Sequence, residues 1–97
     1  MTRPSLEFMP TAPDELTLRL TGEWRLGSGI PAAADAIGQL AALGPCQRLR
    51  FAADGLTRWD SLLLTFLIQV VNHCETAGIT VENHGLPEGV QGLLALA

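Results

Sequence analysis

The sequence predicts an α/β domain built on a mixed β-sheet of about four strands. Segments with the alternation of a strand are separated by segments with the periodicity of a helix, in the order strand, strand, helix, strand, helix, strand, helix. Strands that alternate with helices form βα units, whose strands run parallel. The two consecutive strand-like segments at the start add an antiparallel edge. The 97 residues suffice for one domain with a single hydrophobic core.

The two ends of the chain carry little predicted structure. Residues 1–13 are expected to form an extended leader, and residues 14–97 the folded domain. Three prolines between positions 4 and 13 exclude a helix, so Leu6–Met9 can form at most a short edge strand. The N-terminus lacks the apolar region of a signal peptide. The last residues are apolar and uncapped, which is expected either of a piece cut from a longer polypeptide or of a short protein whose last helix packs down.

The first strands and the first helix are predicted from alternation and from residues that begin helices. Leu16–Gly22 alternates apolar and polar residues and ends at glycine, which predicts a half-buried strand. Glu23–Leu26 continues the alternation and predicts a short second strand. Gly27–Pro31 predicts a turn, in which Ser28 is a candidate cap for a helix that stops before Gly44. The expected inward stripe of this helix consists of Ile30, Ala33 or Ala34, Ile37, Leu40 and Ala41.

A central strand and a loop are expected in the middle of the chain. Arg48–Ala53 predicts a strand that buries Leu49 and Phe51 on opposite phases. Asp54–Asp60 predicts the loop into the next helix. The chain then closes with a short strand and a short helix, at Ile79–Glu82 and from Pro87 onward.

The central helix gives the strongest signal in the sequence. Asp60 and Ser61 are residue types that accept hydrogen bonds from the free N–H groups of a first turn, and Gly78 supplies a left-handed stop. The apolar arc of the helix is about twice the roughly 100° that one buried face needs. The excess indicates either cover by neighbouring elements or a partner-binding surface at Leu64 and Ile68. The expected core positions are Leu63, Phe66, Leu67, Val70 and Cys74.

Composition excludes several classes of function. The six basic residues are all arginine, against ten acidic ones, for a net charge of −4. Without a basic cluster, neither nucleic acid nor anionic lipid is an expected partner. Cys46 and Cys74 lack metal-site spacing, and His73 and His84 have no third ligand nearby, so no metal or cofactor is expected. The uncharged run Ser61–Cys74 is about four to six residues shorter than a membrane span, so we expect a cytosolic domain without membrane insertion.

No arrangement of residues predicts catalysis. Ser61 and His73 lie about three helical turns apart, too far for a hydrogen bond, and the Gly-x-Ser-x-Gly pattern of a nucleophile is absent. We therefore expect no enzyme and no catalytic residue. A module that binds a small molecule or a lipid remains an alternative, and it requires a sizeable apolar pocket.

The two tryptophans have different expected roles. Trp24 is expected to pack in the core or on an edge strand. Trp59, beside the start of the central helix, is either an exposed anchor for a partner or part of the core. If it is an anchor, Trp59→Ala weakens partner binding and leaves thermal unfolding nearly unchanged.

The order of the elements and three short motifs resemble the STAS domain family, named for sulfate transporters and anti-sigma factor antagonists. The likeness covers Leu16–Leu94, and the motifs are Leu20–Trp24, Trp59–Leu63 and Gly85–Pro87. They are most similar to the STAS domain fused ahead of the permease in bacterial Mla-type lipid-transport ABC systems. The resemblance implies a mixed sheet with helices packed mainly on one side. It also implies a non-enzymatic regulatory domain at the cytosolic face of the inner membrane, with the ABC ATPase subunit and the permease domain as partners.

The resemblance also implies where the functional site lies. Antagonists of the family carry Asp-Ser-Ser or Asp-Ser-Thr at this helix start, and a kinase-like partner phosphorylates the second hydroxyl. Asp60 and Ser61 match the first two positions, whereas Leu62 cannot accept phosphate. Ser61 is therefore a candidate phosphoacceptor, a partner contact or only a cap, and a free-standing phospho-switch of the antagonist type is the alternative function. The expected partner surface consists of Trp59, Asp60, Ser61, Leu62, Leu64, Thr65 and Ile68.

Overall fold

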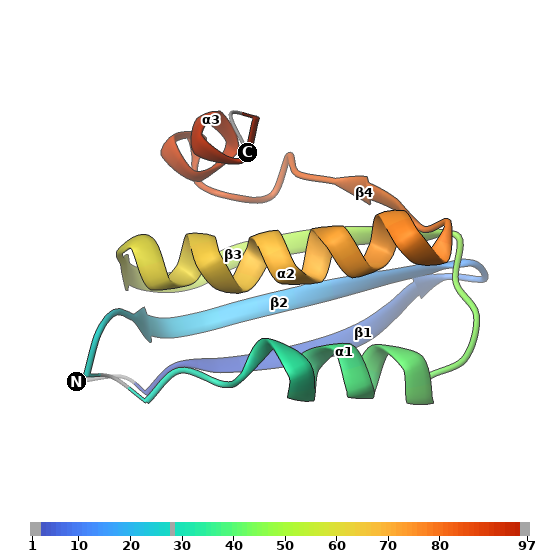
Figure 1. Cartoon of the computed structure of the whole chain (residues 1–97), viewed down its shortest axis with the longest axis horizontal. Helices are drawn as coiled ribbons and strands as arrows, with labels where there is room; N and C mark the ends of the chain where they lie inside the picture. Colours follow the sequence, from blue (N-terminus) through green and yellow to red (C-terminus); the bar gives the residue numbers. More distant parts are fainter. Residues whose placement is uncertain (1–2, 28, 96–97) are drawn as a thin grey trace.

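A computed structural model describes residues 3–27 and 29–95 as one sheet with three helices. The sheet has the order β1-β2-β3-β4, in which β1 runs antiparallel to β2 and the remaining neighbours are parallel. Figure 1 shows α1 and α2 side by side over the sheet and α3 beyond β4. The predicted α/β class with a four-stranded mixed sheet is confirmed. The elements are β1 (Ser5–Ala12), β2 (Glu15–Trp24), α1 (Ala33–Ala42), β3 (Arg48–Trp59), α2 (Ser61–Ala77), β4 (Thr80–Glu82) and α3 (Glu88–Ala95).

The antiparallel edge is built from different segments than the sequence predicts. The expected leader supplies β1, an eight-residue strand that is longer than the short edge strand expected there. β1 accommodates Pro10 because a strand at the edge of a sheet leaves some of its N–H groups unpaired. β2 is one continuous strand where two were predicted, since Gly22 adopts a φ of 86° and the chain passes through a bulge without ending. A side chain at Gly22 would collide with the carbonyl oxygen of Arg3, so the segment just before β1 passes close to β2 there.

β3 is longer than predicted and absorbs most of the expected loop. It spans 12 residues, and its last residue, Trp59, lies opposite Trp24 in β2. Leu49 and Phe51 are both buried. Residues two apart on a strand share a face, so the prediction of opposite phases is wrong and both side chains point toward the helices.

α1 differs from its prediction in its start and in its inner face. It begins after Ala32, whose side chain makes no cap hydrogen bond, and the predicted cap Ser28 lies outside the described residues. Ile37 is only half-buried and Ala41 is exposed, so the inner stripe is rotated from the predicted one. Small side chains in this stripe allow a close approach to the sheet. The buried residues of α1 are Ala33, Ala36 and Leu40.

α2 packs on the sheet as its sequence predicts. All five expected core positions are buried, and Gly78 ends the helix with a φ of 76°. Trp24 is fully buried and meets Phe66 edge-on, with ring centroids 4.9 Å apart. Its indole Nε1 donates to the carbonyl oxygen of Thr21 at 2.9 Å, which places this tryptophan in the core as expected. Within residues 3–27 and 29–95, no helix is long and apolar enough to cross a membrane.

Candidate functional site

The candidate site lies where β3 passes into α2. The backbone N–H of Asp60 donates to the carbonyl oxygen of Trp24 at 3.1 Å, which continues the pairing of β2 and β3 by one residue. This hydrogen bond fixes the first turn of α2 beside the segment that leaves β2. In open α/β sheets, such carboxyl ends of parallel strands are where binding sites form.

Asp60 connects the helix to the segment after β2 with both oxygens of one carboxylate. Oδ1 accepts a hydrogen bond from the backbone N–H of Leu62 at 2.9 Å, which caps the helix. Oδ2 accepts one from the backbone N–H of Leu26 at 2.9 Å. The hydrogen bonds from Leu26 and Leu62, with a smaller contribution from the charge of Arg25, lower the pKa of Asp60. Asp60 is thus the cap, and the side chain of Ser61 is not needed for that role.

The residues beside this cap are exposed. Ser61 is the first residue of α2 and is exposed, as is Thr65 one turn later, whose hydroxyl donates to the carbonyl oxygen of Ser61 at 3.0 Å. Leu26 is 81% exposed although it is a large apolar residue. The alternation had predicted a short strand over Glu23–Leu26, but β2 ends at Trp24 and Leu26 lies beyond it. No pattern in the sequence marks Leu26 as a surface residue.

The predicted surface residues divide between two sides of α2. Leu62 and Thr65 line a groove of about 350 Å³ shared with the segment that enters α1. Ile68 lines a separate hollow of about 310 Å³ that also includes Leu94 of α3. Leu64 lies one turn before Ile68 and shares its side of the helix, and both are half-buried. Contact with neighbouring elements therefore explains part of the wide apolar arc that the sequence of α2 shows.

Trp59 is half-buried and packs against the hydrophobic core. A Cβ atom placed on Gly89 of α3 would lie 3.5 Å from two carbons of its indole ring. The ring therefore contacts α3, and only part of it faces solvent. Trp59 was expected either to anchor a partner or to pack in the core, and the contact with α3 is explained by packing.

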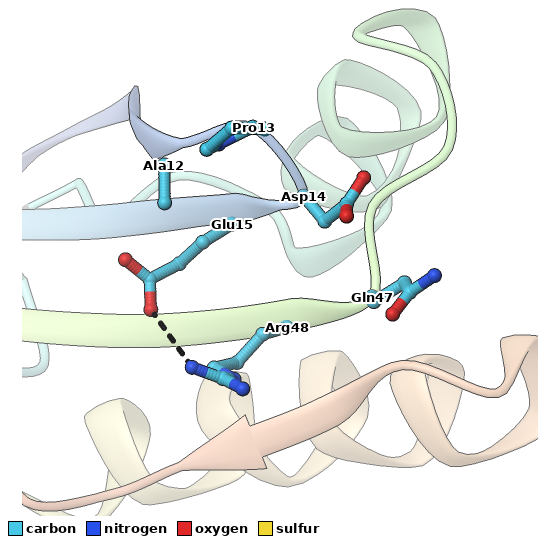
Figure 2. Close-up of a pocket in the computed structure, with 6 residues that line it drawn as sticks. All are labelled: Ala12, Pro13, Asp14, Glu15, Gln47 and Arg48. Carbon is cyan, nitrogen blue, oxygen red and sulfur yellow. Dashed lines mark ion pairs between the residues drawn. The ribbon is translucent and has the colours of Figure 1, made fainter.

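A third hollow, of about 240 Å³ and shown in Figure 2, is lined by the β1–β2 turn and the start of β3. Glu15 and Arg48 line it, and their charged groups are 3.7 Å apart. Glu82 binds the neighbouring Arg50 at 3.0 Å, so carboxylates neutralise both arginines on this face of the sheet. Such paired cations offer an anion little attraction, and this hollow contains none of the predicted site residues.

The cysteines and histidines form no site. Cys46 is half-buried and Cys74 is buried, and both are free thiols. Burial raises the pKa of Cys46, and burial together with the nearby Cys46 raises the pKa of Cys74 to about 11. Both therefore remain protonated and unreactive near neutral pH. Among the described residues, no three His, Cys, Asp or Glu side chains are grouped as metal ligands.

Comparison with solved structures identifies the fold. The chain is similar to the Bacillus cell fate determinant SpoIIAA in its phosphorylated form, with a TM-score of 0.68 and 9% identity over 95% of this chain and 82% of that one. It is also similar to the anti-sigma factor antagonist SpoIIAA in its unphosphorylated form, with a TM-score of 0.65 and 12% identity over 95% and 79% of the two chains. No protein-family model and no curated protein sequence matches the chain.

The fold is therefore the STAS fold of SpoIIAA, as the sequence motifs predicted. A further similar structure is Mglu in its L-glutamate binding form, with a TM-score of 0.54 and 19% identity over 79% of this chain. The match spans 26% of the Mglu chain, so there the fold is one part of a larger protein. At these identities the likeness establishes architecture, and function has to be argued from the site.

Proposed function

We propose that this domain is a non-enzymatic interaction module that binds a protein partner through the first turn of α2. The observation that carries the proposal is the exposed group formed by Leu26, Ser61 and Thr65 beside the carboxylate of Asp60. An exposed apolar side chain next to hydroxyl groups, held on a rigid helix start, suits protein docking. SpoIIAA, which has the same fold, is described as an anti-sigma factor antagonist.

The partner that the motifs favour is the ATPase subunit of a lipid-transport ABC system of the Mla type, with this domain joined to the permease. Two features support it: the likeness of Leu20–Trp24, Trp59–Leu63 and Gly85–Pro87 to that group, and the presence of Leu62 where antagonists carry a phosphorylated hydroxyl. In this proposal the domain acts at the cytosolic face of the membrane. Ser61 and Thr65 contact the subunit, and Leu62 contributes to the adjoining groove.

The proposal is tested by pull-down of the ATPase subunit with substituted domains. We expect Thr65→Arg and Ser61→Glu to weaken binding by roughly tenfold or more, since each places a charge in the interface. Thr76→Arg is the matched control, because Thr76 is also exposed on α2 and its hydroxyl donates to a carbonyl one turn earlier, that of Asn72. Equal affinity of the Thr65 and Thr76 variants would remove the first turn of α2 as the docking surface.

A phospho-switch of the antagonist type is the second candidate. The exposed position of Ser61 at a helix N-terminus favours it, because a helix start stabilises a nearby phosphate. SpoIIAA itself has been described in a phosphorylated form. Incubation with a kinase encoded beside this chain, followed by mass spectrometry, tests the candidate. Phosphate on Ser61 supports the switch, and an unmodified Ser61 under conditions that phosphorylate SpoIIAA-type substrates excludes it.

A further inference from the structure

The hollow between the C-terminal half of α2 and α3 combines apolar and polar walls. Its volume of about 310 Å³ is at the lower end of the range for small-ligand sites. α2 contributes two apolar residues, an amide and a carboxylate, and the segment after β4 and α3 contribute a second amide and a leucine. The lining residues are Ile68, Val71, Asn72, Glu75, Asn83 and Leu94.

Asn83 lines this hollow and carries a buried polar atom without a partner. Its Oδ1 is buried and has no hydrogen-bond partner, a property it shares with Arg25 Nε among the residues that the structure describes. The turn at Asn83 does not depend on that side chain, because it is the backbone carbonyl of Asn83 that accepts the N–H of Leu86 at 3.0 Å. A buried acceptor without a partner costs free energy on folding, so its presence needs another reason.

The polar groups of the hollow suit a primary ammonium. An ammonium has three N–H donors and no acceptor. Glu75 offers a carboxylate, and Asn72 and Asn83 each offer a carboxamide oxygen, since a carboxamide exchanges its oxygen and nitrogen by turning through 180°. The described residues that line the hollow include one anion and no cation, and the chain carries a net charge of −4. The carboxylate in the hollow and the negative net charge of the chain each favour a cationic ligand.

We propose that this hollow binds a primary ammonium group carried on an apolar stem. The ammonium bonds to Glu75, Asn72 and Asn83, and the stem packs on Ile68, Val71 and Leu94. The polar part of the hollow lies outside the docking surface proposed at the first turn of α2. The ammonium site and the docking surface can therefore be tested independently.

The first test is a titration of the intact chain followed by two-dimensional NMR of its backbone amides. The probes are n-hexylammonium, hexan-1-ol and hexanoate, which share a stem and differ in the charge of the head. We expect saturable shifts at Asn72, Glu75 and Asn83 with hexylammonium, smaller shifts with the alcohol and none with the carboxylate. Equal shifts with all three probes, or shifts confined to the groove beside Thr65, would overturn the proposal.

Two variants separate ligand binding from folding. Glu75→Gln, on an exposed helix position, is expected to weaken hexylammonium binding by roughly tenfold, whereas Glu7→Gln on β1 is the control that leaves it unchanged. Asn83→Leu is expected to abolish binding and to keep or raise the unfolding temperature, because it removes the unpaired acceptor. Undiminished binding by Glu75→Gln contradicts the proposal even if Asn83→Leu fails to fold.

A last probe distinguishes two sources of the ammonium group. Nα-acetyl-lysine N-methylamide represents a lysine side chain within a polypeptide, whereas hexylammonium represents a free amine. Tighter binding of the lysine probe supports the site and identifies a partner's lysine as its ligand. Tighter binding of hexylammonium supports the site and identifies a small amine.

Discussion

Asp60 links local and tertiary structure through a single side chain. Any Asp, Asn, Ser or Thr at this position could cap α2. Only a carboxylate provides two equivalent oxygens that accept hydrogen bonds, one from Leu62 in the helix and one from Leu26 after β2. The position of the exposed Leu26 is therefore coupled to the start of the helix.

The charge of Asp60 predicts a pH-dependent stability. Its pKa is lowered in the folded state, so its contribution is present above the usual aspartate pKa of about 3.9 and is lost as the pH falls through the lowered value. We expect Asp60→Asn to unfold at a lower urea concentration than the unaltered chain at pH 7, and the difference to shrink as the pH falls through the lowered pKa. A difference of the same size above and below the lowered pKa would contradict the assigned role of the charge.

The contacts of Trp59 predict an effect on stability. Because its ring packs on the core and against α3, we expect Trp59→Ala to cost about 2 kcal/mol of unfolding free energy, half of what a fully buried aromatic residue would cost. Leu26→Ala is the control, since an exposed side chain contributes less than about 0.5 kcal/mol. Guanidinium unfolding measures both. Identical stability of the two variants would show that the indole is free of α3.

At the scale of elements, α2 owes its two ends to different residues. Asp60 begins it by accepting an N–H group, and Gly78 ends it with a left-handed backbone whose N–H bonds to the last carbonyls of the helix. Between them the five buried positions fix the helix on the sheet. The buried stripe leaves the first turn of α2 uncovered at Ser61 and Thr65, where we propose the docking surface.

Two glycines in helical surroundings predict opposite effects of the same substitution. Gly78→Ala is expected to cost about 1 kcal/mol, because the residue has a φ of 76° that a side chain disfavours. Gly38→Ala, inside α1 with open space around it, is expected to gain about 0.5–1 kcal/mol. Thermal unfolding of both variants in parallel checks the pair. Stabilisation by both substitutions would mean that Gly78 does not hold its left-handed conformation.

The same elements show how far the sequence predicts the fold. The periodicity of α2, with its cap and its glycine stop, was sufficient to place its core residues. The β1–β2 edge was not predicted correctly, because the prolines limited the first segment to a short edge strand at most and Gly22 looked like an end. The division of Thr65 and Ile68 between two hollows depends on where the segment before α1 and α3 pack, which are tertiary contacts that no local pattern contains.

At the scale of the whole molecule, stability is expected to be uneven. β2 and β3 form the centre of the sheet beneath α2, whereas β4 has three residues and α3 has Val90 as its buried residue. Elements with few buried contacts open at lower free energy. Regions that open first also border the hollow at Asn83, so a ligand bound there is expected to slow their opening.

Hydrogen exchange tests whether local stability differs between these elements. We expect amides of β4 and α3 to exchange well before those of β2, β3 and the middle of α2, as measured by mass spectrometry of peptic fragments. Addition of hexylammonium should protect α3 and the end of β4 selectively. Simultaneous exchange of all elements would indicate that the domain opens only as a unit.

The hairpin between β1 and β2 offers an attachment point for a reporter dye. Pro13 is exposed there, and the ten residues of β2 separate it by about 30 Å from Leu26 and Ser61. The native thiols have raised pKa values, so a maleimide at neutral pH should react first with a cysteine introduced as Pro13→Cys. A fluorophore on that remote loop would allow the proposed partner binding to be followed by anisotropy without obstructing the proposed docking surface.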